Sequence, residues 1–400
     1  MRPARRRDGS NTSTPSSAAH DWVVVGCGLT GATFARCIAE RSAARVLVVD
    51  QRSHIGGNVF DSLDDSGVRV QRYGAHIFHT GSDDIWNFLS RFTDWFPYQH
   101  RVLASVNDQL VPIPFNFTSL ERLLPAEAAD MKRDLLIEFP GQQRVPVARL
   151  VGSPTRSVRE LGEFVLETVF RHYTAKQWGQ PIEKVDPAVL SRVPVTLSHD
   201  DRYFRDKYQA IPSRGYTALV ERLLDHPGID VALETDGAGA LRQTHGVRAL
   251  WTGRIDAFFE YEFGALPYRS LRFENVHRRS ADGLPVAVVN HPSADVAFTR
   301  VIDHRHFAPT NTAATTLTYE YPTPYQAGHN EPFYPVSDPS SMAMFDSYAA
   351  LARDTDVLFA GRLGDFRYYD MHQAVGRAMT LAGVALEGRC DPHQLATTSR

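Results

Sequence analysis

Two short, uninterrupted apolar runs near the start of the chain predict buried strands. Trp22–Val25 leads into a glycine-rich turn, and Val46–Val49 ends in the acidic residue Asp50. Between them, Ala32–Ala39 carries the small and apolar residues that are typical of a packed helix. Neither run alternates apolar and polar positions, so both match strands of a parallel sheet that is covered on both faces. The segment therefore predicts a βαβ unit.

The hydrophobic period becomes helical in the next part of the chain. Ala126–Phe139 predicts a helix that a proline-glycine pair ends, and Leu161–Phe170 carries apolar residues at helical spacing. The apolar piece Val145–Val151 is ambiguous because a proline interrupts it. We interpret the whole region as a mainly helical insert.

After Ser191 the chain becomes richer in β-branched and aromatic residues, and three segments predict strands: Val286–Val289, Ala297–Ile302 and Thr315–Tyr321. Near the end, Val357–Gly361 is a further buried strand that meets a glycine, and Gln373–Leu386 predicts a closing helix. If this last strand and helix return to the first βαβ unit, the domain they complete is discontinuous in sequence.

Composition excludes several classes of protein. The chain has 400 residues, of which 43% are hydrophobic and 22% charged, as in a globular protein of two or three domains. Its net charge of -3 argues against a nucleic-acid binder, which needs a basic surface. No apolar run approaches the ~20 residues of a membrane span. Cys27, Cys37 and Cys390 have no spacing for a disulfide framework or a zinc site, which fits a reduced, cytoplasmic location.

The glycine pattern Gly26-x-Gly28-x-x-Gly31 gives the first indication of chemistry. In its place after a strand and before a helix, it predicts a tight turn, a close approach of a pyrophosphate to the backbone, and close packing of helix on strand. The pyrophosphate would lie at the helix N-terminus, where free N–H groups favour anions. Asp50 follows at about the ~20-residue spacing expected of an acid that binds a ribose hydroxyl.

A second glycine pair, Gly56-Gly57, follows Asp50 and extends the loop toward the cofactor, with Arg52 available for phosphate. This extended pattern resembles the glutathione-reductase-like class of FAD proteins, particularly its amine-oxidase-like branch, so FAD is favoured over NAD. The predicted cofactor residues here are Gly26, Gly28, Thr30, Gly31, Asp50, Gln51, Arg52, Gly57 and Asn58.

His76 and His79 lie three residues apart and admit three interpretations: a metal site, ordinary packing, or a loop that faces a flavin. No third ligand stands at a suitable spacing, and Gly74 just before them suggests close approach of the backbone to a flat group. We expect no metal and place His76 and Ile77 beside the flavin.

Further tracts resemble those of bacterial UDP-galactopyranose mutases, in the same order and from Asp21 to about Leu386. The tracts are Gly74-Ala75-His76-Ile77-Phe78-His79-Thr80, Pro114-Phe115-Asn116, Thr174-Ala175-Lys176-Gln177-Trp178-Gly179, Phe263-Gly264-Ala265-Leu266, Tyr268-Arg269-Ser270-Leu271, Thr299-Arg300, Glu331-Pro332-Phe333-Tyr334-Pro335-Val336, Gly361-Arg362-Leu363 and Tyr368-Tyr369-Asp370-Met371-His372-Gln373.

The resemblance implies roles for individual residues. Arg192 and Arg300 correspond to the arginines that bind the substrate diphosphate, a task that suits planar guanidinium groups. Trp178 corresponds to the tryptophan of a mobile segment that closes on the nucleotide, and Tyr173 to an aromatic residue that packs on the uracil. The remaining matches are substrate-binding Tyr203, Tyr334 and Tyr368; Asn290, Arg269, Glu320 and Asp370, which line the sugar pocket or support the arginines; and Arg362, Asp370 and Met371 at the FAD site.

The resemblance also implies a reaction. FAD, active when reduced, attacks the anomeric carbon of UDP-galactopyranose through N5, and the sugar contracts to galactofuranose through an iminium adduct before the diphosphate returns. The catalytic residues would be Arg192, Arg300 and His76. The chain shows no convincing Ser/His/Asp triad, pair of catalytic carboxylates or metal cage. An external reductant such as NAD(P)H and a homodimer are expected.

Departures from the family pattern leave the substrate open. Arg254 stands where relatives carry proline, Arg214 where a glycine is usual, and Arg202 where a smaller polar residue is common. The base-contacting phenylalanine is not clearly matched, since Val169 and Phe170 both lie there. The same chemistry on dTDP-fucopyranose is therefore the alternative. A flavin amine oxidase-like oxidoreductase and a non-catalytic nucleotide-binding protein are the other classes.

The predicted fold class is thus α/β, with a discontinuous Rossmann-like FAD-binding domain, a helical insert and an antiparallel sheet domain. We assign residues 21–105, 215–255 and 345–390 to the FAD-binding domain, 118–190 to the helical domain with its mobile loop, and 106–117, 191–214 and 256–344 to the sheet domain that contacts substrate. Residues 1–20 lack the apolar core of a signal peptide and, with 391–400, are expected to be flexible tails.

Overall fold

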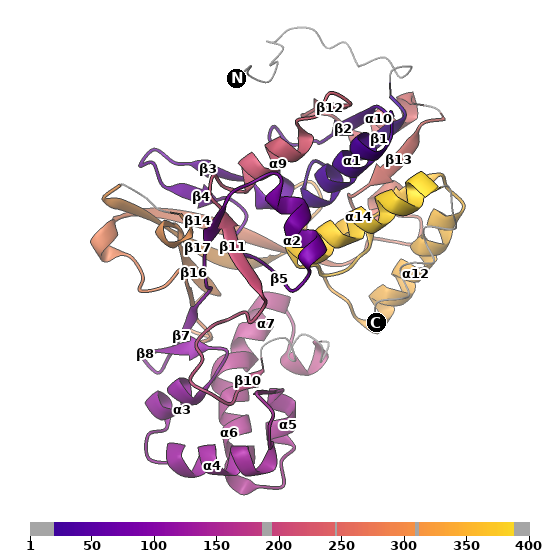
Figure 1. Ribbon diagram of the computed structural model, residues 1–400. Coiled ribbons are helices and arrows are strands. Elements are labelled where there is room, and N and C mark those ends of the chain that lie inside the picture. The colour runs from indigo at the N-terminus through magenta and orange to yellow at the C-terminus, as the bar shows by residue number, and fades with distance from the viewer. Residues whose placement is uncertain (1–19, 186–193, 245, 309–311, 388–400) are drawn as a thin grey trace.

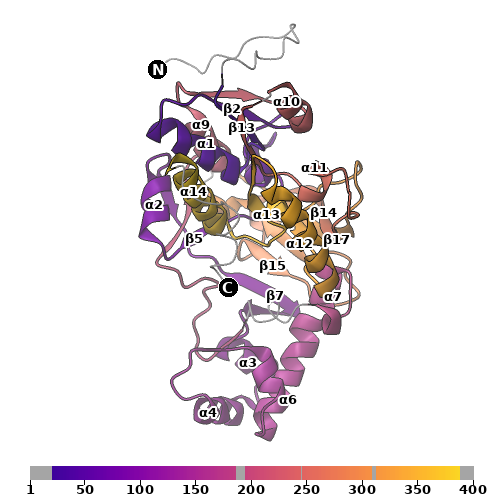
Figure 2. The same cartoon turned by 90° about the vertical axis from the view of Figure 1, so that its right-hand side faces the viewer.

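The structure is a computed structural model that describes residues 20–185, 194–244, 246–308 and 312–387. Its parts follow one another along one long direction (Figure 1). A parallel sheet with helices occupies one end, a large sheet lies in the middle, and a group of helices forms the other end. The view from the side shows the same succession, with the central sheet between the two helical parts (Figure 2).

The first part is built on a parallel sheet with five strands among the described residues. Their order is β12 (Ile229–Ala232), β2 (Val46–Val49), β1 (Trp22–Val25), β13 (Arg248–Trp251) and β19 (Val357–Phe359). Each neighbouring pair is parallel. The strands come from three separate stretches of sequence, so the Rossmann-like domain is discontinuous as predicted.

Both faces of this sheet are covered, which explains why its strands do not alternate in polarity. Trp22 and Val24 of β1 belong to one core cluster, and Val23 and Val25 belong to another. The first cluster includes residues of α1 (Leu29–Arg41), α9 (Tyr216–Leu224) and α14 (Met371–Glu387); the second includes residues of α10 (Gly237–Gln243), α11 (Ile255–Phe258) and α12 (Pro339–Arg353).

The last helix returns to the first. α14 runs beside α1, as Figures 1 and 2 both show, and residues of both helices pack in the same core cluster. The short helix α13 (Gly361–Gly364) follows β19 directly and precedes α14. This arrangement brings residues from near the end of the chain to the glycine turn near its beginning.

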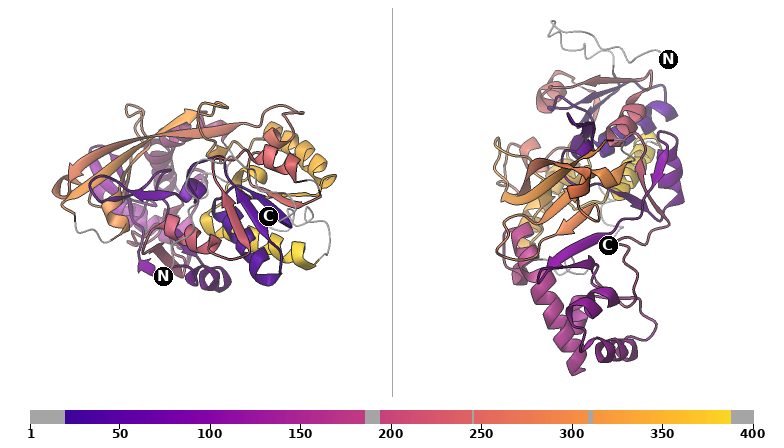
Figure 3. Two further views of the ribbon diagram at one scale, coloured as in Figure 1. Left: turned by 90° about the horizontal axis from the view of Figure 1, so that it is seen from above. Right: turned by 90° about the vertical axis from the view of Figure 1, so that its left-hand side faces the viewer.

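The central part is a mixed sheet with seven strands among the described residues. Their order is β18 (Tyr334–Pro335), β14 (Tyr268–Arg279), β17 (Ala314–Pro324), β16 (Arg300–Asp303), β15 (Val288–Asn290), β7 (Val102–Val106) and β8 (Gln109–Ile113). All neighbours are antiparallel except β15 and β7. Its long β14–β17 pair extends away from the parallel sheet, as the view from above shows (Figure 3).

Smaller pieces connect the two sheets. β5 (Phe78–Thr80), β11 (Tyr208–Pro212) and β6 (Trp95–Pro97) form an antiparallel sheet with β11 in the middle. β3 (Asp61–Leu63) pairs with β4 (Arg69–Gln71), and α2 (Asp83–Ser90) follows β5. The loop between β4 and β5 carries His76 and lies where the parallel sheet and the central sheet meet.

The helical part contains α3 (Phe117–Leu123), α4 (Ala128–Glu138), α5 (Val147–Val151), α6 (Arg156–Val165) and α7 (His172–Trp178). A π-helical turn, residues 166–171, joins α6 to α7, so one long rod leads from the helical part to the central sheet. The ambiguous piece Val145–Val151 divides at its proline: β9 (Arg144–Val145) pairs with β10 (Val195–Thr196), and α5 follows.

In the predicted domain division, two strands pair differently from what we expected. The boundary at residue 105 cuts β7, which pairs with β8 and β15 and therefore belongs wholly to the central sheet. β11, which we had assigned to the sheet domain, pairs instead with β5 and β6. The predicted tails lie outside the described residues, apart from His20. The rest of the domain division stays an interpretation.

No helix in the described ranges is both long and apolar enough to cross a membrane.

A buried histidine in the central part fixes one chain of hydrogen bonds. The backbone N–H of Gln71 donates to Nδ1 of His304 (3.3 Å), and His304 Nε2 lies 2.8 Å from the hydroxyl of Thr318, which donates to Asn275 (2.6 Å). Nδ1 is therefore an acceptor and Nε2 a donor. Burial, with a smaller contribution from the charge of Arg72, lowers the pKa of His304 to about 3.

This pKa predicts acid sensitivity. Because unfolded His304 titrates near its ordinary value and the folded residue stays neutral, the unfolded state binds more protons below pH 6.5, and stability falls as pH falls. Between pH 7 and 5.5 we expect His304 to cost about 1 kcal/mol of unfolding free energy. His304→Gln, which cannot titrate there, should flatten the pH dependence measured by denaturant unfolding. Equal slopes in both proteins would contradict the assignment.

Candidate functional site at the junction of the two sheets

The glycine turn after β1 is shaped by close backbone contacts. Gly26 has φ +105°, and a Cβ there would lie 1.9 Å from the Thr252 hydroxyl oxygen. A Cβ on Gly31 would lie 1.9 Å from the carbonyl oxygen of Gly26, so only glycine lets α1 pack on the strand. Gly28 is the N-cap of α1 and supplies no side-chain cap, which leaves the first N–H groups of the helix available to an anion.

The second glycine pair meets the first. Gly28 and Gly56 form an isolated parallel bridge, and a Cβ on Gly57 would lie 2.9 Å from the Gly28 Cα. From the other end of the chain, Gly361 (φ +84°) lies close to Thr30: a Cβ added to this glycine would be 3.2 Å from the Thr30 hydroxyl oxygen. Three segments far apart in sequence therefore close around the N-terminus of α1. Gly361 was not among the predicted site residues, since only its positive φ marks it.

Asp50 organises this loop. One of its carboxylate oxygens accepts the N–H of Cys27 (2.8 Å) and the other accepts the N–H of Arg52 (2.9 Å). The guanidinium of Arg52 donates to Asn58 (3.1 Å) and to Glu331 (2.7 Å). The predicted residues Asp50, Arg52 and Asn58 are thus joined in one network, whereas the neighbouring Gln51 is exposed.

The β4–β5 loop lies against the central sheet. Gly74 has φ +95°, and a Cβ there would lie 3.1 Å from a carboxylate oxygen of Glu320 and 3.5 Å from a guanidinium nitrogen of Arg300. His76 donates from Nδ1 to the carbonyl of Gly74 (2.8 Å), so its Nε2 is an acceptor when the ring is neutral. Burial, then the charges of Arg362 and Arg300, lower the pKa of His76 to about 4.

Gln71 holds His76 in place. Its side-chain carbonyl accepts the N–H of His76 (2.6 Å), and its amide donates to the carbonyl of His76 (3.1 Å). Gln71 is buried in β4. The sequence carried no signal for this residue, because its partner lies around a turn that only the fold defines. The predicted Ile77 is buried next to His76.

A buried ion pair forms the centre of the site. Arg300, the first residue of β16, donates to Glu320 of β17 (2.8 Å), which is 1% exposed, and the two residues face each other in the strand register. Burial acts to lower the pKa of Arg300, but the negative charge of Glu320, its hydrogen bond and the nearby phenols of Tyr173 and Tyr334 together outweigh burial, and the net shift is upward. Among the described residues, the buried Nε of Arg300 has no hydrogen-bond partner, and the side chain as a whole is 23% exposed. A partly paired guanidinium therefore lies at the junction.

Aromatic side chains stand around this pair. Tyr334 and Tyr368 stack with ring centroids 5.6 Å apart, and the Arg362 guanidinium lies over both rings. The ring centroids of Trp178 and Tyr334 lie 6.3 Å apart. Burial raises the pKa of Tyr334, with a further contribution from the charge of Glu320, so the phenol keeps its proton near neutral pH.

Tyr173 extends the cluster on the side of α7. Burial raises the pKa of its hydroxyl. The charge of Arg300 acts in the opposite direction, whereas Glu320 and Tyr203 add to the rise, so the hydroxyl lies within electrostatic reach of all three residues. Asn290 is directly opposite Arg300 in the β15–β16 register. Tyr173, Tyr203, Asn290, Trp178, Tyr334, Tyr368 and Arg300 are therefore brought to one region.

The remaining predicted site residues lie in three different places. Arg269 donates to the carbonyls of Gln177 (3.0 Å) and Lys176 (3.2 Å), so it holds the end of α7. Met371 begins α14 and packs against the core cluster that contains Cys27, and Asp370 precedes it. Arg192 lies outside the described residues.

The departures from the family pattern have structural partners. Arg202 binds Asp200 through two nitrogens, at 2.9 and 2.8 Å, and Arg254 lies over Tyr261 and Tyr325. Val169 and Phe170 fall on the π-helical turn and are both buried in the core cluster. None of these contacts involves the Arg300 cluster. Arg214 is exposed.

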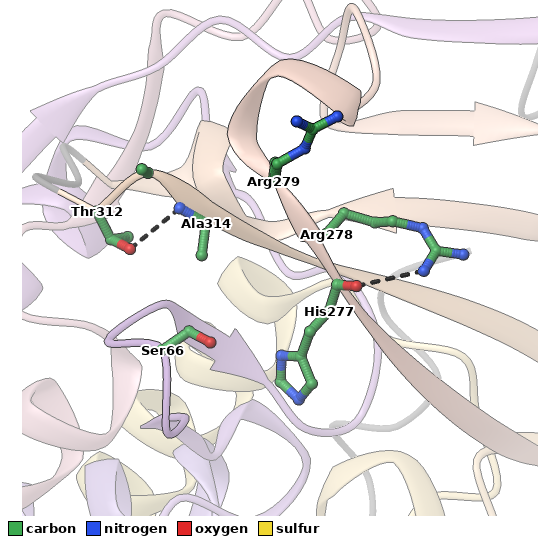
Figure 4. Close-up of a pocket in the computed structure, with 7 residues that line it drawn as sticks. Ser66, His277, Arg278, Arg279, Thr312 and Ala314 are labelled. Atoms are coloured by element: carbon green, nitrogen blue, oxygen red, sulfur yellow. Dashed lines mark hydrogen bonds between the residues drawn. The ribbon is translucent and has the colours of Figure 1, made fainter.

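A separate open pocket of about 590 Å³ lies at the far end of β14, away from Arg269. Its lining residues are Ser66, His277, Arg278, Arg279 and 312–314 (Figure 4). In Figure 4 the guanidinium of Arg278 lies at the carbonyl oxygen of His277, to which it donates (3.3 Å), while the Arg279 side chain and the His277 ring point in different directions, so the basic groups do not converge. In the described part of the chain, His, Cys, Asp and Glu side chains form no group that could hold a metal ion.

The described geometry defines a nucleotide-binding α/β protein with a second sheet at its ligand site, and comparisons with known proteins specify the family. Residues 168–368 match the UDP-galactopyranose mutase family model, and residues 24–92 match the NAD(P)-binding Rossmann-like domain. A Klebsiella pneumoniae protein named probable UDP-galactopyranose mutase is 33% identical over 90% of this chain and 93% of its own length. The Escherichia coli dTDP-fucopyranose mutase is 33% identical over 90% and 97%.

The fold agrees with these matches. A crystal structure of reduced UDP-galactopyranose mutase superposes with a TM-score of 0.71 at 14% identity, covering 95% of this chain and 97% of that one. The chain belongs to the UDP-galactopyranose mutase family, whose members are isomerases. Both the family and the Rossmann-like domain imply a flavin-type cofactor. The glycine cradle formed by Gly28 and Gly57 and the unpartnered Nε of Arg300 fit such a group and an anionic ligand.

This cradle leads to a test of cofactor binding. In Gly57→Ala, the new Cβ would meet the Gly28 Cα at 2.9 Å from a φ of +52°, so the loop must move. We expect the purified variant to carry several-fold less flavin per polypeptide, measured by absorbance after denaturation. Gly67→Ala, which also has positive φ but nothing within 4 Å, is the matched control for backbone strain alone. Equal flavin content in Gly57→Ala and wild type would contradict the proposed cradle.

Proposed function

We propose that the protein is an FAD-dependent mutase that interconverts UDP-galactopyranose and UDP-galactofuranose. The observation that carries the proposal is the buried Arg300–Glu320 pair, which stands beside the His76 loop and carries an unpartnered donor. The family matches supply the reaction class, and the arrangement of cationic and aromatic groups suits a nucleoside diphosphate attached to a sugar.

Bound FAD in its reduced form would supply a nucleophilic nitrogen at the anomeric carbon, with no net redox change over the reaction. Gly26, Gly28, Gly31 and Gly57 would hold the cofactor backbone, and Asp50 would bind its ribose as well as the backbone N–H groups it already accepts. A reductant such as NAD(P)H would keep the flavin active. We also propose a homodimer as the working assembly.

Arg300 has the most direct chemical task. As the bond between the anomeric carbon and the diphosphate breaks, negative charge grows on the leaving group, and a preorganised guanidinium stabilises that charge. Glu320 fixes one side of Arg300, and the exposed part of its side chain, about a quarter, would face the ligand. Arg192 would be the second cation at the diphosphate.

His76 acts in its neutral form in this proposal. Its pKa of about 4 keeps the ring uncharged near neutral pH, and its Nδ1–H is engaged with Gly74. The remaining Nε2 can accept a hydrogen bond from the cofactor or the sugar. Tyr334 and Tyr368 would donate hydrogen bonds to phosphate or sugar oxygens, and Tyr173 and Trp178 would bind the nucleotide.

A second substrate deserves the same test, because one relative that is 33% identical is named dTDP-fucopyranose mutase. The two nucleotide sugars share the diphosphate and differ in the base, at the 2′ position of the nucleoside and at sugar C6. A single hydroxyl can decide such selectivity when a buried partner would be left without its hydrogen bond.

The experiment uses the purified protein reduced with dithionite. UDP-galactopyranose and dTDP-fucopyranose are offered separately, and the nucleotide sugars are separated by chromatography. We expect a furanose product from at least one of them, and only with reduced protein. Hydrogen peroxide release with amines and no furanose product would instead support an amine oxidase-like oxidoreductase.

Substitution of Arg300 tests its charge. Arg300→Ala should lower kcat by about 10²–10³-fold while flavin stays bound, because the leaving-group charge loses its partner. Arg300→Lys should recover only part of the rate, since an ammonium cannot replace the guanidinium fork. Arg279→Ala, at an exposed arginine of β14, is the control and should keep full turnover. Unchanged kcat in Arg300→Ala would exclude this role.

A further inference from the structure

The side chain of Lys176, on α7, ends among four backbone carbonyl oxygens. Its Nζ lies 2.6 Å from the carbonyl of His291, 2.9 Å from that of Ser293, 2.8 Å from that of Val296 and 3.0 Å from that of Phe298. An ammonium group has only three protons, so four carbonyls saturate it. All four of these partners are backbone groups, and no carboxylate is among them.

All four carbonyls belong to the loop that joins β15 to β16. This loop begins after Asn290 and ends at Arg300, and these two residues are opposite each other in the sheet. The N–H of His291 donates to the carbonyl of Thr299 (2.8 Å), which closes the loop at its base. The ammonium is therefore the centre around which this loop is folded, and the loop ends on the arginine of the site.

A positive charge suits this arrangement. Carbonyl dipoles that point at one another repel, and a cation at their focus converts the repulsion into attraction, as carbonyl cages do for K⁺. Burial lowers the pKa of Lys176 to about 8, so the ammonium form still predominates at neutral pH. A neutral side chain in its place would leave the four converging acceptors to water, which reaches this half-buried site.

Lys176 itself belongs to the helix that carries two of the aromatic residues of the site. Tyr173 lies one turn before Lys176 on α7, and Trp178 ends the helix. Arg269 donates to the carbonyls of Lys176 and Gln177, so the same turn of α7 is also attached to β14. Gly179 follows with φ +68° and packs on Arg269, whose guanidinium nitrogen would lie 2.4 Å from a Cβ there.

We propose that Lys176 is a positioning residue whose ammonium, held in a cage of four carbonyls, fixes the 291–299 loop and thereby Arg300 against the helix that carries Tyr173 and Trp178. The assignment rests on the proposed function, since Arg300 is the group it positions. If the lysine side chain is shortened, the same four carbonyls form a site for a monovalent cation.

The test compares two substitutions in the flavin-loaded, full-length protein. Lys176→Ala removes the charge and opens room for an ion, whereas Lys176→Met removes the charge and keeps the volume of the stem. Each is assayed in KCl, NH₄Cl and LiCl at one ionic strength, with kcat, KM and the midpoint of thermal unfolding as readouts. Lys207→Ala, which removes an exposed lysine paired with Asp83, is the matched control.

We expect Lys176→Ala in LiCl to lose about tenfold or more in kcat, with a smaller change in KM, because Arg300 is displaced from the position in which it stabilises the leaving group. K⁺ and NH₄⁺ should restore several-fold of the loss and raise the unfolding midpoint of this variant. Lys176→Met should lose kcat equally and show no response to either ion. Wild type and Lys207→Ala should be indifferent to the choice of cation.

Three results would overturn the proposal. The first is full kcat in either variant in LiCl, and the second is an equal response of Lys176→Ala to Li⁺ and K⁺. The third is failure of both variants to fold in every salt, which would assign the lysine to folding alone. If wild type converts neither nucleotide sugar, the proposed function fails, but the K⁺-selective rise in the unfolding midpoint of Lys176→Ala still tests the cage separately.

Discussion

The buried pair of Arg300 and Glu320 is the constraint on which the rest of the site depends. A guanidinium group at a protein interior is unfavourable unless its charge is matched, and Glu320, at 1% exposure, is the residue that matches it. Glu320 alone would be equally unfavourable. Each residue therefore requires the other, and their strand register places both at the junction between the sheets. The exposed part of the Arg300 side chain is left for a ligand.

The architecture explains how this pair reaches the nucleotide-binding loop. The parallel sheet is assembled from the beginning, middle and end of the chain, and the connections between these segments form the central sheet and the helical part. The β4–β5 loop carries Gly74 onto the Arg300–Glu320 pair, and a glycine is needed there because a Cβ would come within 3.1 Å of Glu320. From the opposite direction, the residues after β19 bring Arg362 onto Tyr334 and Tyr368.

Local sequence predicted the elements whose signal is local. The two apolar runs, the glycine pattern between them and the closing helix all matched the structure, since period and turn chemistry are carried by neighbouring residues. The long strand β14 was missed because most of its residues are polar and at least partly exposed, so the strand lacks an alternation of apolar and polar positions. The boundary at residue 105 was misplaced because pairing of β7 with β15 is a contact between distant residues.

The nucleotide-binding side of the site could be predicted from local spacing, whereas the substrate side was predictable only through the resemblance to a family. Arg300 and Glu320 are 20 positions apart and individually look like surface charges. Gln71 was not singled out, and Lys176 stood in a family tract without a role, because their roles consist of hydrogen bonds to backbone groups, which any sequence provides. Such contacts become visible only once the fold brings the His76 turn and the 291–299 loop into place.

Calorimetry on the flavin-loaded protein can compare the affinity for UDP with that for uridine in wild type and Arg300→Met, with dTDP and thymidine as a parallel pair. We expect wild type to bind the diphosphate at least tenfold more tightly than the nucleoside, and this preference to disappear largely in Arg300→Met because the cation is gone. An undiminished preference in Arg300→Met would contradict the claim that this pair forms the anion site.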